Sequence, residues 1–210
     1  MNAASRIGTV VDRQYRLDAL LGEGASGAVF RAERPSDSQV FALKLLFGRS
    51  SNDADRARFM REAKALNVLD HPAVVRIFDF GIDEGSPYLV MELLHGAPLG
   101  TILARGPLDT PRALDVAKQI VAGLAYCHGH GVLHRDIKPG NVLVTGRSDG
   151  GLTAKLVDFG LAKFVDAERW GPQSILTAEG AILALGCTLP RSPGAWRRGA
   201  PDSSAMLLSR

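Results

Sequence analysis

The stretch His134–Asn141, with the sequence HRDIKPGN, concentrates an acid, basic side chains, an amide and a rigid proline. It lies between the end of a helical pattern and the short apolar run Val142–Val144, which has the character of a strand. Such side chains on a loop between two regular elements are typical of chemistry rather than of packing. The stretch therefore predicts a loop that performs acid–base chemistry, and the rest of the chain is interpreted around it.

The composition sets limits on the protein that contains this loop. With 210 residues, 46% of them hydrophobic, the chain is long enough for one large domain or two small lobes. The charged residues of 181–210 account for the whole net charge of +3, so the charge indicates no nucleic-acid partner. Cys127 and Cys187 fit neither a disulfide framework nor a zinc site. Residues 1–12 hold no apolar leader and no apolar run approaches a membrane span, so we expect a cytoplasmic protein without a membrane segment.

Three glycines near the N-terminus, Gly22, Gly24 and Gly27, have the spacing G-x-G-x-x-G. A dinucleotide site would need a helix directly after the third glycine, but residues 28–32 resemble a short strand and residues 35–38 a turn. The glycines therefore indicate the tip of a β-hairpin that folds over phosphate groups. The alternative is a glycine-rich turn that binds no ligand.

A lysine and a glutamate fall where charge is hard to accommodate. Lys44 lies midway along the expected strand 39–47, which is apolar on both faces. Glu62 lies within the apolar stripe of an expected helix, 53–69, formed by Phe59, Ala63, Leu66 and Leu69. Because an unpaired buried charge is costly, we expect Lys44 and Glu62 to form an ion pair. The alternatives are a lysine whose ammonium reaches the sheet edge and a solvated glutamate at the margin of the stripe.

Further elements follow on both sides of a predicted boundary at residues 95–98, where the composition turns to breakers. Two strands, 74–80 and 88–94, complete a set of five strands and one helix before it. After it, Thr110 is the expected N-cap of a long helix. The stripe of that helix consists of Leu114, Ala117, Val121, Leu124 and His128. Runs 142–145 and 153–157 then predict a hairpin that leads into Asp158-Phe159-Gly160.

Together these motifs resemble those of eukaryotic-type (Hanks-type) serine/threonine protein kinases, in order and at suitable separations. The motifs are the glycines 22–27 with Val29, Lys44 in Phe41-Ala42-Leu43-Lys44, Glu62, the loop 134–141, and Asp158-Phe159-Gly160. The resemblance covers residues 15–163. It implies an α+β, bilobal fold, with a five-stranded small lobe carrying one helix (15–94) and an incomplete, mainly helical large lobe (95–180). Residues 1–14 would be an N-terminal extension and residues 181–210 a disordered tail outside the family.

The resemblance also implies a role for each matching residue. Lys44 would hold the α- and β-phosphates of ATP and pair with Glu62. Asp136 would accept the proton of a protein serine or threonine hydroxyl, with Lys138 steadying the transferred phosphate, and Asn141 and Asp158 would hold Mg²⁺. The nucleotide-binding set would be Leu21, Gly22, Gly24, Gly27, Val29, Ala42, Lys44, Met91, Glu92, Leu94 and Leu143. In that set Val29, Ala42 and Leu143 would enclose the adenine, and the backbone of Glu92 and Leu94 would bond its edge.

Arg135 has two interpretations. It resembles the arginine of kinases that are switched on by phosphorylation of the activation segment, for which Ser174 and Thr177 are the candidate acceptors here. The alternative is a plain ion pair.

The resemblance ends after Lys163, because no Ala-Pro-Glu motif and no helical patterns follow. A shift of reading frame near Ala181 is one hypothesis for this change. We also expect the loop and hairpin to lose support, leaving Leu133, Val142, Val144 and Leu156 partly exposed and the chain prone to aggregation.

The sequence thus predicts a serine/threonine kinase domain cut short. A non-catalytic module or decoy that binds nucleotide is the alternative, and it would bind Mg·ATP without transferring phosphate. A small-molecule kinase of similar fold is disfavoured by the complete glycine loop and by Lys138. The substrate and the oligomeric state are not predicted.

Overall fold

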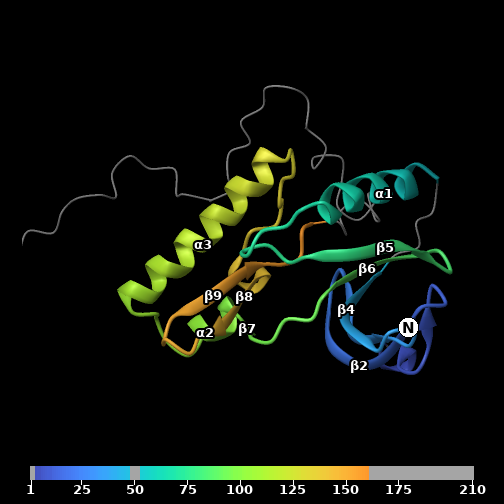
Figure 1. Ribbon diagram of the computed structural model, residues 1–210, viewed down its shortest axis with the longest axis horizontal. Coiled ribbons are helices and arrows are strands. Elements are labelled where there is room, and N and C mark those ends of the chain that lie inside the picture. The colour runs from blue at the N-terminus through green and yellow to red at the C-terminus, as the bar shows by residue number, and fades with distance from the viewer. Residues whose placement is uncertain (1–2, 48–52, 161–210) are drawn as a thin grey trace, which may run out of the picture. The chain divides into compact units, whose positions relative to one another are not determined.

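The computed structural model describes residues 3–47 and 53–160. Its larger sheet has six antiparallel strands in the order β1-β2-β3-β4-β6-β5 (Figure 1). The strands are β1 Val10–Val11, β2 Tyr15–Gly24, β3 Gly27–Arg34, β4 Gln39–Leu46, β5 Ile77–Asp83 and β6 Ser86–Glu92. The five predicted strands of the small lobe are all present, and β1 is an addition that its two-residue length hid from the sequence pattern.

The glycine-rich stretch forms the turn between β2 and β3, as predicted, and no helix follows it. Gly24 and Gly27 face each other across this turn. Gly27 has a φ of 156°, and a β-carbon there would collide with the carbonyl oxygen of Leu45 on β4. A glycine is therefore required at residue 27 for β3 to lie against β4.

Residues 3–14, which the sequence analysis set apart from the small lobe, pack onto its sheet. They form a short 3₁₀ helix, Ala3–Arg6, and strand β1, which pairs with β2. Ala3 and Val11 are buried in a hydrophobic cluster with side chains of β2, β3, β4 and β6. These residues close one side of the sheet.

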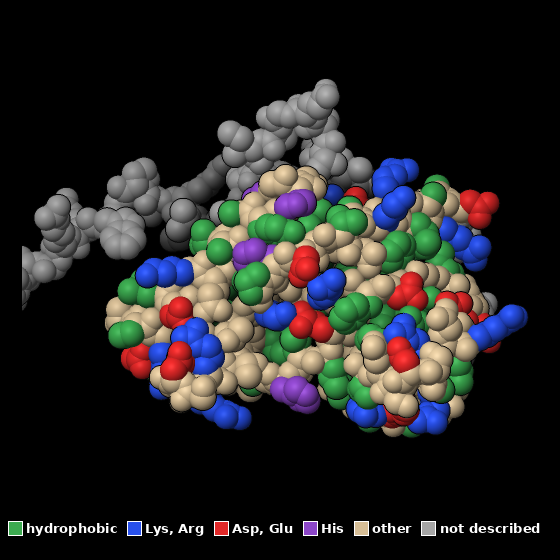
Figure 2. Space-filling model, in the orientation of Figure 1, with side chains coloured by type: hydrophobic (Ala, Val, Ile, Leu, Met, Phe, Trp, Pro, Cys, Tyr) green, Lys and Arg blue, Asp and Glu red, His purple; other side chains and the backbone are tan. Residues whose placement is uncertain are grey.

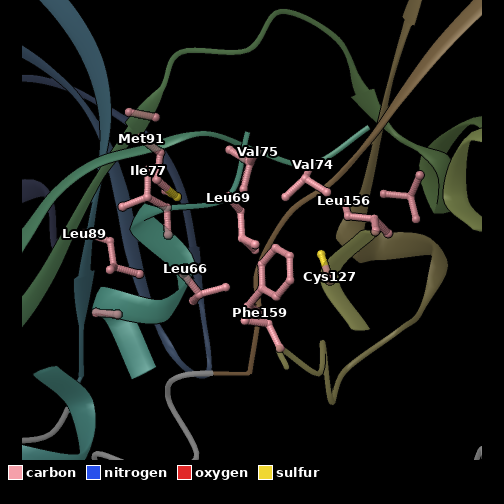
Figure 3. Packing of buried hydrophobic residues seen from close by; sticks show 14 of the residues in the cluster. Leu66, Leu69, Val74, Val75, Ile77, Leu89, Met91, Cys127, Leu156 and Phe159 are labelled. Atoms are coloured by element: carbon pink, nitrogen blue, oxygen red, sulfur yellow. The ribbon is translucent and has the colours of Figure 1, made fainter. Parts of the chain in front are cut away.

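The other side of the sheet is covered by helix α1, Asp53–Asn67, which contacts β5 (Figure 1). Its buried residues are Phe59, Ala63 and Leu66, three of the four residues of the predicted stripe, and Leu69 is buried just after the helix. Figure 3 shows side chains from α1, β5, β6, α3 and β9 meeting in one core. This core continues from the small lobe into the following part of the chain.

The part after the predicted boundary contains a second sheet and the long helix. Strands β7 Ala97–Pro98, β8 Val142–Gly146 and β9 Leu152–Leu156 form a sheet in that order. Helix α2 spans Leu99–Leu103, helix α3 spans Thr110–Gly129, and a 3₁₀ turn spans Pro139–Asn141. Asp109 caps α3 by accepting a hydrogen bond from the Arg112 backbone N–H at 2.8 Å, so the predicted cap at Thr110 is wrong by one residue.

Helix α3 packs through a different face from the one predicted. The residues buried against its surroundings are Val116, Gly123 and Cys127, whereas Leu114 and Val121 of the predicted stripe are 55% and 64% exposed. Gly123 explains the choice, because a β-carbon there would lie only 3.0 Å from the Leu156 side chain and 3.1 Å from the Ala73 carbonyl oxygen. A helix face that lacks a side chain can approach β9 closely.

This packing overturns the expectation that the hairpin is left uncovered. Val142, Val144 and Leu156 are buried, and only Leu133 is half-exposed. The reason is that α3 lies along β9 and covers the hairpin (Figure 1). Two residues of the predicted α3 stripe, Leu114 and Val121, are exposed instead.

Two surface properties complete the description. Acidic and basic side chains are interspersed over the face shown in Figure 2. Among the helices of the described ranges, none has the length and hydropathy that crossing a membrane requires.

Candidate functional site

A cavity of about 460 Å³ brings the predicted loop together with the small-lobe sheet. This volume is within the range of small-molecule sites. Its polar wall comes from Lys44, Asp136, Lys138, Asn141 and Asp158, five of the residues predicted for catalysis and metal binding. Glu62, the sixth, is outside this wall.

The loop 134–141 holds Asp136 in a defined orientation. The Asn141 amide nitrogen donates to both the backbone oxygen and the Oδ2 of Asp136, each at 2.8 Å. The Lys138 ammonium donates to the same Oδ2, also at 2.8 Å. The short 3₁₀ turn that begins at Pro139 sets this arrangement, because it brings the Asn141 N–H to 2.9 Å from the Lys138 carbonyl oxygen. The three residues thus form one cluster.

His134 ties the loop to the segment that carries Asp158. Its ring is buried and its Nε2 donates to the Val157 carbonyl oxygen at 2.9 Å. Burial lowers the pKa of His134, and the hydrogen bond to Val157 opposes that shift only in part. The ring also packs on Phe159, with centroids 4.5 Å apart. A neutral histidine therefore fixes the distance between the two motifs.

The predicted Lys44–Glu62 ion pair is wrong in this structure. Lys44 is buried and its Nζ lies 2.5 Å from Oδ1 of Asp158. Asp158 has a φ of 58°, a conformation in which its carboxylate reaches the strand lysine. Glu62 instead pairs with Arg135 at 3.4 Å. Lys44 and Glu62 each have a partner of opposite charge, as the cost of an unpaired buried charge predicts, but neither is the partner of the other.

The pair with Glu62 is also the plain ion pair that was the alternative interpretation of Arg135. Arg135 adopts a φ of 62°, which a non-glycine residue rarely does. The candidate phosphate acceptors, Ser174 and Thr177, lie outside the described residues, as does the tail 181–210.

The residues predicted to bind nucleotide divide into two groups. Gly24, Lys44 and Met91 line the cavity. Eight others lie outside its lining: Leu21, Gly22, Gly27, Val29, Ala42, Glu92, Leu94 and Leu143. Val29 and Ala42 nevertheless adjoin it, since they pair in register with Lys44 and Met91 respectively.

The sequence pattern did not indicate the apolar inner wall of the cavity. This wall consists of Leu46, Leu66, Val75, Ile77, Leu89 and Phe159. Leu66 belonged to the predicted helix stripe and Phe159 to the motif Asp158-Phe159-Gly160, whereas the other four carry only the pattern of buried strands. Ala25 and Ser26 of the glycine turn also line the cavity, and their place between the glycines was the available signal.

Comparison with known proteins identifies the family and the fold. The protein kinase domain family matches residues 15–178. The chain is 40% identical over 169 residues to the serine/threonine-protein kinase pkn3 of Myxococcus xanthus, an alignment that covers 79% of this chain and 31% of that protein. It is 41% identical over 229 aligned positions to PknH of Mycobacterium tuberculosis, covering 98% and 35% respectively. The second alignment thus extends into residues after 180.

A solved structure gives the same picture. A point mutant of the PknI kinase domain of Mycobacterium tuberculosis superposes with a TM-score of 0.67 at 29% identity, covering 77% of this chain and 64% of that one. The predicted α+β fold of the protein kinase type is confirmed. The chain spans about a third of the length of these two curated relatives.

Proposed function

The chain belongs to the protein kinase family, and we propose that it transfers the terminal phosphoryl group of Mg·ATP to serine and threonine hydroxyls of proteins. The observation that carries the proposal is the Asp136 carboxylate, oriented by Lys138 and Asn141 at the wall of a cavity that also contains Lys44 and Asp158. The relatives named as serine/threonine-protein kinases support the choice of acceptor.

Asp136 would act on the acceptor hydroxyl. Its carboxylate would accept a hydrogen bond from the hydroxyl and orient its oxygen. It would take up the proton as that oxygen bonds to the γ-phosphorus and the bond from this phosphorus to the oxygen of the leaving ADP breaks. Lys138 lies against the same carboxylate, so its ammonium is placed to balance negative charge on the transferred phosphoryl group. The contribution of these residues is positioning and charge neutralisation, because a loose phosphoryl-transfer transition state demands little else.

The donor set fits a magnesium ion. The amide nitrogen of Asn141 donates its hydrogen bonds to Asp136. The amide oxygen of Asn141 is therefore the atom that can ligate a cation. Asp158 supplies a carboxylate on the same cavity wall. Hard cations prefer such oxygen ligands, and bound Mg²⁺ would neutralise phosphate charge. Asn141 and Asp158 would hold it.

Lys44 would serve the phosphates of the nucleotide. Its ammonium is buried at the cavity wall and is held there by Asp158. A buried ammonium without an anionic partner is costly, so phosphate oxygens are suitable partners when a nucleotide enters. The glycine turn beside it would let backbone N–H groups approach those oxygens.

The test is transfer of labelled phosphate from Mg·ATP to a protein acceptor, or to the chain itself, by the full chain. Asp136→Asn should lower the rate by about 10²–10⁴-fold and leave nucleotide binding nearly unchanged, because only proton acceptance is lost. Lys44→Met should lower the transfer rate and also weaken nucleotide binding. Asp149→Asn, an exposed aspartate in the turn between β8 and β9, is the matched control. Full activity of Asp136→Asn would contradict the role of Asp136.

A second candidate function is nucleotide binding without transfer. The ion pairs favour it, since Lys44 is paired with Asp158 and not with Glu62, the partner that the kinase resemblance implies. In that case Mg·ATP would raise the melting temperature of the chain, no phosphate would be transferred, and Asp136→Asn would change neither result.

The proposal also includes a substrate class, inferred from the named relatives, and a cellular location, inferred from the composition. The substrate class is proteins with serine or threonine acceptors, and the location is the cytoplasm.

A further inference from the structure

An ion pair joins the two sheets at the point where the chain leaves the small lobe. Glu92 is the last residue of β6, and Lys155 lies on β9 of the other sheet. The Lys155 Nζ is 2.5 Å from Oε1 of Glu92, and the two side chains are only 21% and 24% exposed. This partial burial distinguishes the pair from the exposed Arg147–Asp149 pair in the adjacent turn.

Backbone hydrogen bonds surround this ion pair and make a closed junction. Oε1 of Glu92 also accepts from the Arg76 backbone N–H at 2.8 Å, and the Glu92 N–H donates to the Arg76 carbonyl oxygen at 3.0 Å. On the opposite side, the Leu156 N–H donates to the Ala73 carbonyl oxygen at 2.8 Å, and the Val75 N–H donates to the Leu156 carbonyl oxygen at 2.9 Å. Residues 73–76 are thus bonded to both sheets.

The junction connects two segments of the proposed nucleotide site. The backbone of Glu92 and Leu94 is proposed to bond the adenine, and Asp158, proposed to hold Mg²⁺ beside the phosphates, lies three residues after Lys155. Lys155 makes the side-chain contact between these two segments. Any change in the distance between β6 and β9 would therefore change the distance between the adenine contacts and the phosphate contacts.

We propose that Lys155 is a positioning residue for the nucleotide, which sets the separation of the adenine-binding and phosphate-binding segments through Glu92. This inference rests on the proposed nucleotide function. Lys155 does not line the cavity, so it acts through Glu92 and not by touching the ligand. One carboxylate oxygen receives both the Lys155 ammonium and the Arg76 N–H, so loss of the ammonium leaves the Glu92 carboxylate bonded to the Arg76 N–H but without the cation that ties it to β9.

The test measures binding of Mg·ADP to the full chain by calorimetry, which needs no catalysis. Lys155→Met should raise the Kd about tenfold, the effect expected for one lost contact within a coupled network. Lys155→Arg should restore most of the affinity, because its guanidinium can still reach the carboxylate. Lys118→Met, which removes an exposed lysine of α3, is the control and should leave the Kd unchanged.

A double-mutant cycle separates positioning from simple stabilisation. Glu92→Gln keeps an oxygen for the Arg76 N–H but removes the charge, so Lys155→Met should cause no further loss of affinity in that background. If Lys155→Met does not fold, Glu92→Gln alone carries the test and should raise the Kd to a similar extent. A purely structural role would lower the melting temperature and leave the Kd of the folded variants unchanged, and that result would overturn the proposal.

The outcomes for the two proposals are distinct. Wild-type chain that binds Mg·ADP but transfers no phosphate would refute the kinase activity and leave the role of Lys155 open to the same measurement of Kd. Wild-type chain that binds no nucleotide would overturn both. In an active chain, Lys155→Met should raise the KM for ATP about tenfold with little change in kcat.

Discussion

The small-lobe sheet and helix α3 differ in how completely their apolar side chains are buried. In the sheet, Leu17, Phe30 and Leu43 have no exposed surface, because residues 3–11 close one side and α1 covers the other. In α3, one apolar face is buried against β9, while Leu114 and Val121 on another face remain largely exposed. The cluster on the N-terminal side of the sheet is thus closed by residues of the small lobe and residues 3–11 alone, whereas α3 has more apolar surface than its described neighbours cover.

The largest expected effect on the free energy of unfolding is at the side of the sheet that residues 3–11 cover. Phe30→Ala should lower the free energy of unfolding by about 3–5 kcal/mol, because it leaves a cavity in a fully buried cluster. Phe78→Ala, on the exposed part of β5, should cost under about 1 kcal/mol. Urea unfolding of the two variants measures both values. Equal losses would show that the sheet is not closed in the way described.

The role of the N-terminal residues can be tested at two adjacent valines. Val11 is fully buried and Val10 is exposed, although both belong to β1. Val11→Ala should cost about 2 kcal/mol through lost burial and a residual cavity, while Val10→Ala should stay within about 0.5 kcal/mol. If residues 3–14 were a detached extension, both substitutions would be neutral in the same unfolding experiment.

Two buried tyrosines make the stability of the small-lobe sheet sensitive to high pH. The Tyr15 hydroxyl donates to Asp79 and the Tyr88 hydroxyl donates to Asp12, each at 2.8 Å. Burial, with help from Asp79, raises the pKa of Tyr15 to about 12, against about 10 in an unfolded chain. The stabilising effect of Tyr15 is therefore complete below pH 10 and is lost as the pH rises towards 12.

The measurement is the free energy of unfolding between pH 9 and pH 12. The wild-type curve should fall by up to about 1.4 kcal/mol per pH unit more steeply than the curve of Tyr15→Phe, which cannot ionise. Parallel curves for the two proteins would show that Tyr15 ionises as easily in the folded chain as in the unfolded one.

The smallest effect on stability is expected on the exposed face of α3. Replacing both Leu114 and Val121 by Gln should change the free energy of unfolding by no more than about 0.5 kcal/mol, yet it should reduce aggregation measured by light scattering. Val116→Gln, on the buried face of the same helix, should destabilise by more than about 2 kcal/mol. A large loss of stability in the first variant would mean that its face is covered in solution.

The motif residues were predictable because each signal is local. The order of His134, Asp136, Asn141 and Asp158 along the chain, and the alternation of the strands, follow from neighbouring residues alone. The cluster of Asp136, Lys138 and Asn141 spans six residues, so a tight loop could hardly separate them. The burial of Lys44 followed for the same reason, since both faces of its own strand are apolar.

From the sequence alone it was therefore possible to predict most of the regular elements, the protein-kinase type of fold and the polar residues of the cavity wall. Only the tertiary structure decided which partner each charge takes: Lys44 with Asp158, Glu62 with Arg135 and Lys155 with Glu92. It also decided which face of α3 is buried, through the close approach of β9 at Gly123. The physical reason is the distance along the chain between the residues that interact. Periodicity and turn chemistry act between residues a few positions apart, whereas ion pairs and packing faces depend on segments that the chain brings together from far away.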